Sequence, residues 1–285
     1  MDGKLARATG SGSALGLLFD HGCDAVNVIF GTFIFATILG TGSLHPAKAQ
    51  VVTALCFLNN ATPFFFATWE EYFTNKLILP VINGPSEGVL IGVVLAWITP
   101  FVGPDFWWGT SVPIFGYTLS PAELLLGGSV LSWSATIIYQ TANVLQFQRG
   151  SGRSLIRPLR DMLGYLILCV CGGLWLIPKP ELYARHSQLI VILIGLLNVD
   201  TLCTLMLSHM CTIDFNPFRP ILAPLVLACV NSYVLEKPIV SDEEFLLSYA
   251  VLTAVCVPIY IIRIVVAVRE ALQIYVFSLR KRKAE

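Results

Sequence analysis

Hydrophobic residues along the chain form eight long stretches, which are separated by polar segments rich in glycine and proline. A helix needs about 20 consecutive, mostly apolar residues to cross a bilayer. The stretches lie near residues 14–40, 48–68, 87–103, 122–146, 158–177, 188–209, 218–235 and 246–277. This pattern predicts about eight transmembrane helices, of which 87–103 and 218–235 are the shortest.

The composition supports a membrane protein. The 285 residues are 55% hydrophobic and 13% charged, whereas soluble domains are about 25% charged. The eight cysteines lie mostly inside apolar stretches and form no Cys-x-x-Cys pair, so neither a zinc site nor a disulfide framework is indicated. The formal net charge of zero gives no support for a nucleic-acid partner. We expect an all-α polytopic integral membrane protein, with residues 1–285 forming a single domain in the lipid bilayer.

The basic residues predict the orientation of the chain. If residues 1–13 face the cytosol, the segments 69–86, 147–157 and 210–217 and the tail after 277 face it too. Twelve lysine and arginine residues lie in or beside these segments, against four on the opposite side. Cytosolic segments of membrane proteins carry such an excess of positive charge. We therefore expect the N-terminal polar segment to lie at the cytosolic face.

The densest group of reactive side chains lies in residues 2–24. Gly16, Asp20 and Asp24 follow one another at intervals of four residues, so a helix places them on one stripe. Two carboxylates about 6 Å apart in a low dielectric repel each other, so one of them holds a proton or a cation lies between them. Asp2 adds a third carboxylate, and Arg7 adds a guanidinium suited to phosphate. The group predicts metal-assisted chemistry on a phosphate ester or anhydride.

These residues form the pattern DG-x2-AR-x8-G-x3-D-x3-D, which resembles the signature of the CDP-alcohol phosphotransferases. The chain matches it at Asp2, Gly3, Ala6, Arg7, Gly16, Asp20 and Asp24. The surrounding sequence, residues 69–72, 83–88 and 207–280 included, is similar to the eukaryotic choline/ethanolamine phosphotransferase branch. The resemblance covers essentially the whole chain. It implies a phosphotransferase core in residues 1–145, followed in 146–285 by C-terminal transmembrane helices and a basic cytosolic tail.

The resemblance implies an enzyme that transfers phosphocholine or phosphoethanolamine from CDP-choline or CDP-ethanolamine to diacylglycerol and releases CMP, a step of phospholipid biosynthesis. The choice between the two donors is not readable from the motif. The implied cofactor is a pair of Mg²⁺ or Mn²⁺ ions held by Asp2, Asp20 and Asp24, with Asp24 also acting as the catalytic base. The implied substrate contacts are Gly3, Ala6, Arg7, Ser13 and Gly16.

Three further residues are candidates for contacts in the same site. His21 lies between the two motif acids and could touch the substrate. Glu87 lies at the entrance to a predicted span on the same side, and its carboxylate could pair with the ammonium group of choline or ethanolamine. His209, near the cytosolic end of its span, is a rival candidate for the proton-accepting base.

Other polar residues have structural interpretations. We expect an interfacial belt with solvated acids at Trp69-Glu70-Glu71-Tyr72 and a polar pair or interhelical hydrogen bond at Asp200. A solvated loop is expected at Asp242, Glu243 and Glu244, and the positive-inside bias accounts for Arg149, Arg153, Arg157 and Arg160, with attraction of an anionic lipid or nucleotide as the lesser alternative.

The chain departs from the family pattern at its beginning. The family has a further aspartate three residues before the Asp-Gly pair, and it has ten spans where this chain has eight. We expect an N-terminal truncation, and a natural form beginning at Met1 is expected to be inactive.

The alternatives to this enzymatic function are a cation-coupled transporter and an inactive paralogue. Transporters tend to show inverted repeats and midplane sites, and no repeat is evident. The resemblance further implies an endoplasmic reticulum or Golgi membrane, a cytosol-facing site and a homodimer.

Overall fold

The computed structural model describes residues 8, 12, 14–76, 88–103, 105–114, 116–276 and 278–281. Its main helices are α2 (Ala14–Ile38), α3 (Pro46–Thr74), α4 (Val89–Val102), α6 (Pro121–Gly150), α8 (Leu163–Leu176), α9 (Pro180–Cys211), α10 (Ala223–Tyr233) and α11 (Asp242–Leu272). Short helices connect them: η1 (Thr41–Ser43), α5 (Phe106–Gly109), α7 (Ile156–Asp161) and η3 (Pro220–Leu222). Two small antiparallel hairpins pair β1 (Val112–Ile114) with β2 (Tyr117–Leu119), and β3 (Ile274–Tyr275) with β4 (Ser278–Lys281).

The predicted fold class is confirmed. Six helical segments in the described part of the chain are long and apolar enough to cross a membrane, and two shorter apolar helices span 90–102 and 220–233. A helix is present in every one of the eight predicted stretches, and these two shorter apolar helices fall in the two shortest stretches. The protein is therefore a multi-pass helical membrane protein.

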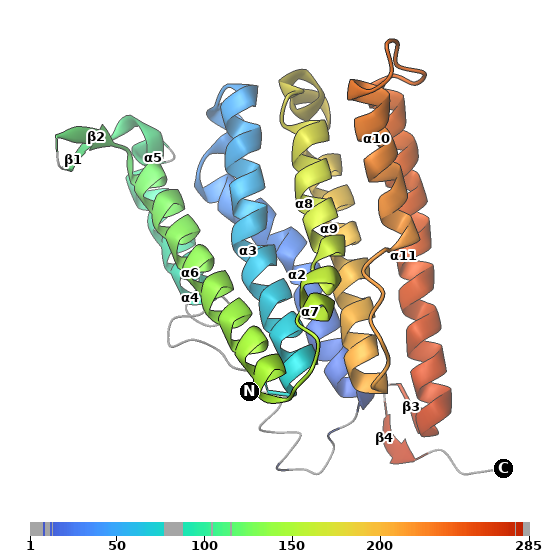
Figure 1. Cartoon of the computed structure of the whole chain (residues 1–285). Helices are drawn as coiled ribbons and strands as arrows, with labels where there is room; N and C mark the ends of the chain where they lie inside the picture. Colours follow the sequence, from blue (N-terminus) through green and yellow to red (C-terminus); the bar gives the residue numbers. More distant parts are fainter. Residues whose placement is uncertain are drawn as a thin grey trace.

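Helix α9 is the centre of the bundle. It packs against α2, α3, α8 and α11, while α6 packs on the outer side of α3 and α10 on α8. Most residues in the apolar part of α9 are buried, whereas few of those in α6 and α11 are. Figure 1 shows the long helices running up and down together, with α6 diverging from α3 toward the end that carries β1 and β2. We call the opposite end, at which α2 begins, the acidic end, because α2 carries Asp20 and Asp24 there.

Helix α11 begins earlier than its apolar stretch predicts. Ser241 accepts a hydrogen bond from the backbone of Glu244, whose carboxylate accepts one from Ser241 in return, forming a capping box. Asp242 forms an ion pair with Lys179, and Glu243 contacts Arg185 at 2.8 Å. The prediction of a solvated loop at these acids is wrong, because they tie the first turn of α11 to the start of α9.

Small residues bring α2 close to its neighbours. A Cβ added to Gly195 of α9 would lie 2.3 Å from Cγ1 of Ile29 on α2. A Cβ added to Gly31 of α2 would lie 2.9 Å from the Asn60 side chain on α3. Small residues at helix contacts allow this approach in membrane proteins, where dispersion and close packing drive association. These contacts fix the rotation of α2, and with it the direction of its acidic stripe.

Alanine at Gly195 is expected to destabilise the protein by about 1–3 kcal/mol, because the added methyl group overpacks the contact with Ile29. The matched control is Gly128→Ala on α6, where an added Cβ meets nothing within 4 Å. That change should be neutral or stabilising by about 0.5–1 kcal/mol, the ordinary helix gain of alanine over glycine. Denaturation in detergent micelles measures both, and equal stabilities for the two variants would contradict the close packing of α2 on α9.

Candidate active site

The first three turns of α2 carry the described part of the acidic motif. Leu15, Leu18 and Ala25 are buried on the packed side of the helix. Gly16, Asp20 and Asp24 are exposed on the other side, so the predicted stripe is present. The remaining predicted site residues, Asp2, Gly3, Ala6, Arg7, Ser13 and Glu87, lie outside the described residues.

An apolar pocket of about 300 Å³ lies beside this stripe, between α2, α9 and α11. Phe19 and Cys23, the neighbours of the two acids in sequence, line it on α2, and Cys203 and Ile264 line it on α9 and α11. The acids and the pocket therefore share one segment of α2. A substrate whose reactive group lies near the acids could therefore place an apolar part in this pocket, within the membrane.

The two candidate histidines lie on packed sides of their helices. The ring of His21 stacks on Phe64 of α3, with 6.2 Å between ring centroids. Its Nδ1 is buried and has no hydrogen-bond partner among the described residues. His209 lies at the end of α9, where its ring is 6.4 Å from the ring of Tyr72. His21 therefore contacts α3 rather than the exposed stripe.

The residues at the end of α3 that were predicted to form an interfacial belt are in part buried between helices. The side chains of Trp69 and Glu70 are completely buried. Trp69 donates a hydrogen bond to the carbonyl of Pro158, and Glu70 accepts one from Asn143 of α6 at 3.0 Å. The prediction of solvated acids is wrong for Glu70, because its carboxylate is buried against α6, where Asn143 donates to it. Its second oxygen, Oε2, has no partner among the described residues.

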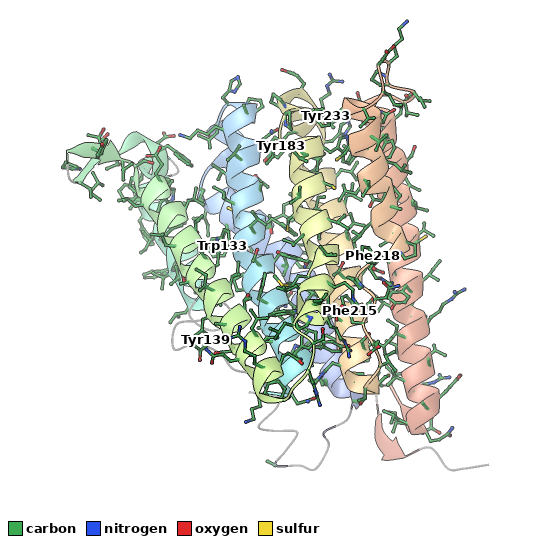
Figure 2. The ribbon with its side chains drawn as sticks, in the orientation of Figure 1. Trp133, Tyr139, Tyr183, Phe215, Phe218 and Tyr233 are labelled. Atoms are coloured by element: carbon green, nitrogen blue, oxygen red, sulfur yellow. The ribbon has the colours of Figure 1, made fainter. Side chains whose placement is uncertain are left out.

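Tyr72 joins three segments through one hydroxyl group. It donates a hydrogen bond to the carbonyl of Ile213 at 3.1 Å and accepts from the backbone of Phe215 at 3.0 Å. It also accepts from Arg157 at 2.7 Å. Figure 2 shows Phe215 and Phe218 in the segment between α9 and α10. Tyr72 thus anchors that segment to α3 at the acidic end.

Phenylalanine at Tyr72 is expected to cost about 1–3 kcal/mol, because it leaves the backbone groups of Ile213 and Phe215 without their partner. Hydrogen exchange should accelerate in residues 212–219 and change little in α11. Tyr233→Phe is the matched control, since that hydroxyl makes a single exposed hydrogen bond, to Leu174. Equal exchange of 212–219 in both variants would show that Tyr72 does not anchor the segment.

Asp200 forms the polar pair that its position predicts. Its two carboxylate oxygens accept hydrogen bonds from Arg219 at 2.8 and 3.1 Å, and the two side chains are only 4% and 18% exposed. The guanidinium lies over the ring of Tyr260, 4.8 Å from its centroid, and the Tyr260 hydroxyl contacts Thr204 at 3.0 Å. This network connects α9, α11 and the residue before η3, so we assign Asp200 to the architecture of the bundle.

Two of the four arginines near residue 155 are also structural. Arg160 donates two hydrogen bonds to one oxygen of the buried Asp161. Arg157 pairs with Asp214 at 2.6 Å in addition to its contact with Tyr72. Both arginines therefore have specific partners beyond a general positive bias. The pair of Arg157 and Asp214 holds α7 against the segment that follows α9, whereas the pair of Arg160 and Asp161 lies within α7.

The donor set of the stripe fits a divalent metal ion. Asp20 and Asp24 present carboxylate oxygens one turn apart on an exposed face, and Mg²⁺ and Mn²⁺ prefer such hard oxygen donors. The described residues contain no cluster of three or more metal-binding side chains. The third predicted carboxylate, Asp2, lies outside them. The described stripe therefore supplies part of a metal site.

The fold and this site together define a polytopic helical membrane protein with a carboxylate site at one end of its bundle. No protein-family model matches the chain. Curated relatives do: the chain is 30% identical over 313 aligned positions to choline/ethanolaminephosphotransferase 1 of Arabidopsis thaliana, and 30% identical over 314 to choline/ethanolaminephosphotransferase 2 of that plant. Each match covers the whole chain and 75% of the relative. Human ethanolaminephosphotransferase 1 is 24% identical over 291 positions and is covered to 71%.

The chain therefore belongs to the CDP-alcohol phosphotransferase family, in its choline/ethanolaminephosphotransferase branch. The members of this family are enzymes. The resemblance predicted from the motif at residues 2–24 is thus confirmed by matches that extend over all of the chain.

Proposed function

We propose that the protein transfers phosphocholine or phosphoethanolamine from CDP-choline or CDP-ethanolamine to diacylglycerol, with release of CMP. The observation that carries this proposal is the pair of exposed carboxylates, Asp20 and Asp24, next to an apolar pocket on the same helix. The names of the relatives support the same reaction. A transporter has no comparable support, because the relatives carry the names of phosphotransferases.

The reaction requires one proton to leave the acceptor and one anion to leave the donor. In the proposal, the carboxylate of Asp24 takes the proton from the hydroxyl group of diacylglycerol. The hydroxyl oxygen then forms a bond to the phosphorus that bears the amino alcohol. The bond from that phosphorus to the bridging oxygen breaks, and CMP leaves with the electron pair. Bound divalent ions would neutralise the charge of the pyrophosphate and of the departing CMP.

The motif residues have separate roles in this reaction. Asp2, Asp20 and Asp24 hold the metal ions, while Gly3, Ala6, Arg7, Ser13 and Gly16 contact the CDP-alcohol. The exposed Gly16 adds no side chain at the start of the stripe, which leaves room for a nucleotide. Residues 1–145 form the catalytic core, and helices from 146–285 complete the bundle.

The apolar pocket gives the acceptor lipid a place beside the acids. Its volume of about 300 Å³ lies between α2, α9 and α11, and its lining is almost wholly apolar. An acyl chain in this pocket would hold the hydroxyl group of diacylglycerol near the stripe. The ends of the acyl chains would remain in the hydrocarbon interior of the bilayer. Orientation with the acidic end toward the cytosol, residence in endoplasmic reticulum or Golgi membranes, and a homodimer complete the proposal.

Removal of divalent metal is expected to abolish transfer. EDTA should lower CMP release to the background, and Mg²⁺ or Mn²⁺ should restore it. Electron paramagnetic resonance of added Mn²⁺ supplies a readout apart from activity: the bound signal should be strong in the wild type and weak in Asp20→Asn. Full transfer in EDTA would contradict the metal site.

A further inference from the structure

A second pocket lies far from the acids, between α3, α8 and α9. It has a volume of about 120 Å³. Gln50, Thr53 and Tyr183 are the residues on its wall with hydrogen-bonding side chains other than a thiol, and no charged residue lines it. Gln50 and Tyr183 lie in the first two turns of α3 and α9, at the end of the bundle opposite the acidic end. Figure 2 shows Tyr183 near that end.

Gln50 leaves one strong acceptor unused at this pocket. The side chain is 5% exposed, and its amide nitrogen donates a hydrogen bond to the carbonyl of Ile177. That bond fixes the orientation of the amide, because the amide oxygen could not face a carbonyl. The oxygen, Oε1, is buried and has no partner among the described residues. A buried acceptor without a donor is costly, more so at membrane depth.

The neighbouring hydroxyl pair leaves one donor unused. The hydroxyls of Thr53 and Tyr183 lie 2.7 Å apart, so one donates to the other. Whichever hydroxyl accepts keeps its own proton, and neither has another hydrogen bond within the described part of the chain. The polar edge of the pocket thus offers one acceptor and one donor. A single alcohol group, which both donates and accepts, satisfies this pair.

The rest of the pocket suits a hydrocarbon chain. Phe57, Leu168 and Ile194 line it deeper in the bundle, and Phe57 lies about 10 Å along α3 from Gln50. The polar edge is therefore near the membrane surface and the apolar wall runs toward the bilayer centre. This is the arrangement of a lipid with a small polar head. The lack of a lining cation argues against a phosphate headgroup.

We propose that this pocket binds a neutral lipid with a free hydroxyl group, namely diacylglycerol, in the membrane leaflet opposite the carboxylate site. The hydroxyl pairs with Gln50 and with the hydroxyl pair of Thr53 and Tyr183. The volume of about 120 Å³ takes the head and the adjoining part of one acyl chain, which lies against α8 and α9. The choice of diacylglycerol over another hydroxyl lipid rests on the proposed function, in which diacylglycerol is the acceptor. The existence of the site rests on the unused donor and acceptor alone.

Photolabelling of the protein in vesicles tests the site. The probe is diacylglycerol with a diazirine in one acyl chain, and labelled peptides are mapped by mass spectrometry. Peptides covering 50–58, 168–177 and 183–194 should carry the label. Gln50→Leu should lower labelling of these peptides about three- to tenfold, the loss expected for one hydrogen bond. Unchanged labelling in Gln50→Leu would overturn the proposal.

A second variant covers the case in which Gln50→Leu does not fold. Leucine at Gly173 adds a side chain at the pocket wall, where an added Cβ would be in ordinary contact with Ile177 at 3.7 Å. It should block labelling and leave the polar edge intact. Gly128→Leu on α6, where a Cβ meets nothing within 4 Å, is the matched control and should label normally. Equal labelling of both glycine variants would overturn the site.

Other lipids and a catalytic variant separate the remaining explanations. Diazirine phosphatidylcholine with the same acyl chain should label these peptides far less, and equal labelling would overturn the proposal, because that lipid has no free hydroxyl group. Preferential labelling by a photoreactive sterol would overturn the assignment to diacylglycerol. Asp24→Asn should keep the labelling. If the wild type is labelled at these peptides but releases no CMP, the proposed function is wrong and the pocket stands. If it releases CMP but these peptides carry no label, the pocket proposal is wrong and the proposed function stands.

Discussion

Asparagine in place of Asp24 is expected to lower CMP release by about 10²- to 10⁴-fold, the range for loss of a positioned acid or base. The amide keeps the size of the carboxylate but cannot take the proton of the acceptor hydroxyl, and it binds a divalent cation poorly. The side chain is exposed on α2, so the fold should survive the change. Release of radiolabelled CMP measures the effect, with the unfolding temperature in detergent as the check on folding.

Two controls make this result specific to Asp24. Asp105→Asn is the same chemical change at an exposed acid beside α5, at the other end of the bundle, and it should leave the rate within about threefold of the wild type. His209→Gln tests the rival base and should act like Asp105→Asn. If His209→Gln abolishes transfer while Asp24→Asn keeps more than a tenth of it, the proton acceptor is His209.

Alanine at Asp200 is expected to destabilise the protein by about 3–5 kcal/mol, because it leaves the guanidinium of Arg219 buried without its counter-charge. The bidentate geometry and the 4% exposure of Asp200 place this effect at the upper end of the range for single substitutions. Denaturation in detergent micelles gives the free energy of unfolding. The double variant Asp200→Leu with Arg219→Met removes both charges and should recover much of the loss.

An exposed ion pair gives the contrast for this prediction. Arg269 and Glu270 are 35% and 58% exposed and lie 3.1 Å apart. Glu270→Ala should cost less than about 1 kcal/mol, as exposed pairs do. A loss below about 1 kcal/mol in Asp200→Ala would show that water reaches Arg219 and that the pair does not hold the bundle together.

Two features of the chain were predictable from its sequence because they depend on local patterns. A transmembrane helix needs only length and a lack of charge, and the eight apolar stretches carry both signals. The stripe of Gly16, Asp20 and Asp24 follows from the helical period alone, and the exposure of these residues agrees with it. The packed face of α2 is likewise visible in the spacing of Leu15, Leu18 and Ala25.

The errors arose where a polar residue has a partner distant in sequence. Glu70 was expected in water because an acid near a helix end is usually solvated, yet its partner Asn143 lies on α6. Tyr72 reads as an interfacial aromatic, but its hydroxyl contacts residues 157, 213 and 215. No local period marks such pairings, because they depend on which helices become neighbours.

The role of Asp200 was predictable only in part. Its depth in a long apolar stretch predicts a partner, since an unpaired carboxylate there would be costly. The identity of the partner was not predictable, because Arg219 follows the end of α9 and reads as one of the basic residues at the membrane surface. The structure shows that the chain turns back after Thr212, which has a φ of 55°, and brings Arg219 against α9.

A double-label transfer assay tests the central claim most directly. The protein, expressed from its complete reading frame, receives CDP-choline that carries ¹⁴C in the choline and ³H in the cytidine, with diacylglycerol and Mg²⁺; CDP-ethanolamine is tested in parallel. The account predicts equal amounts of ¹⁴C in extracted lipid and of ³H in CMP, and none when diacylglycerol is omitted. Absence of labelled lipid with either donor, or release of free phosphocholine instead, would contradict it.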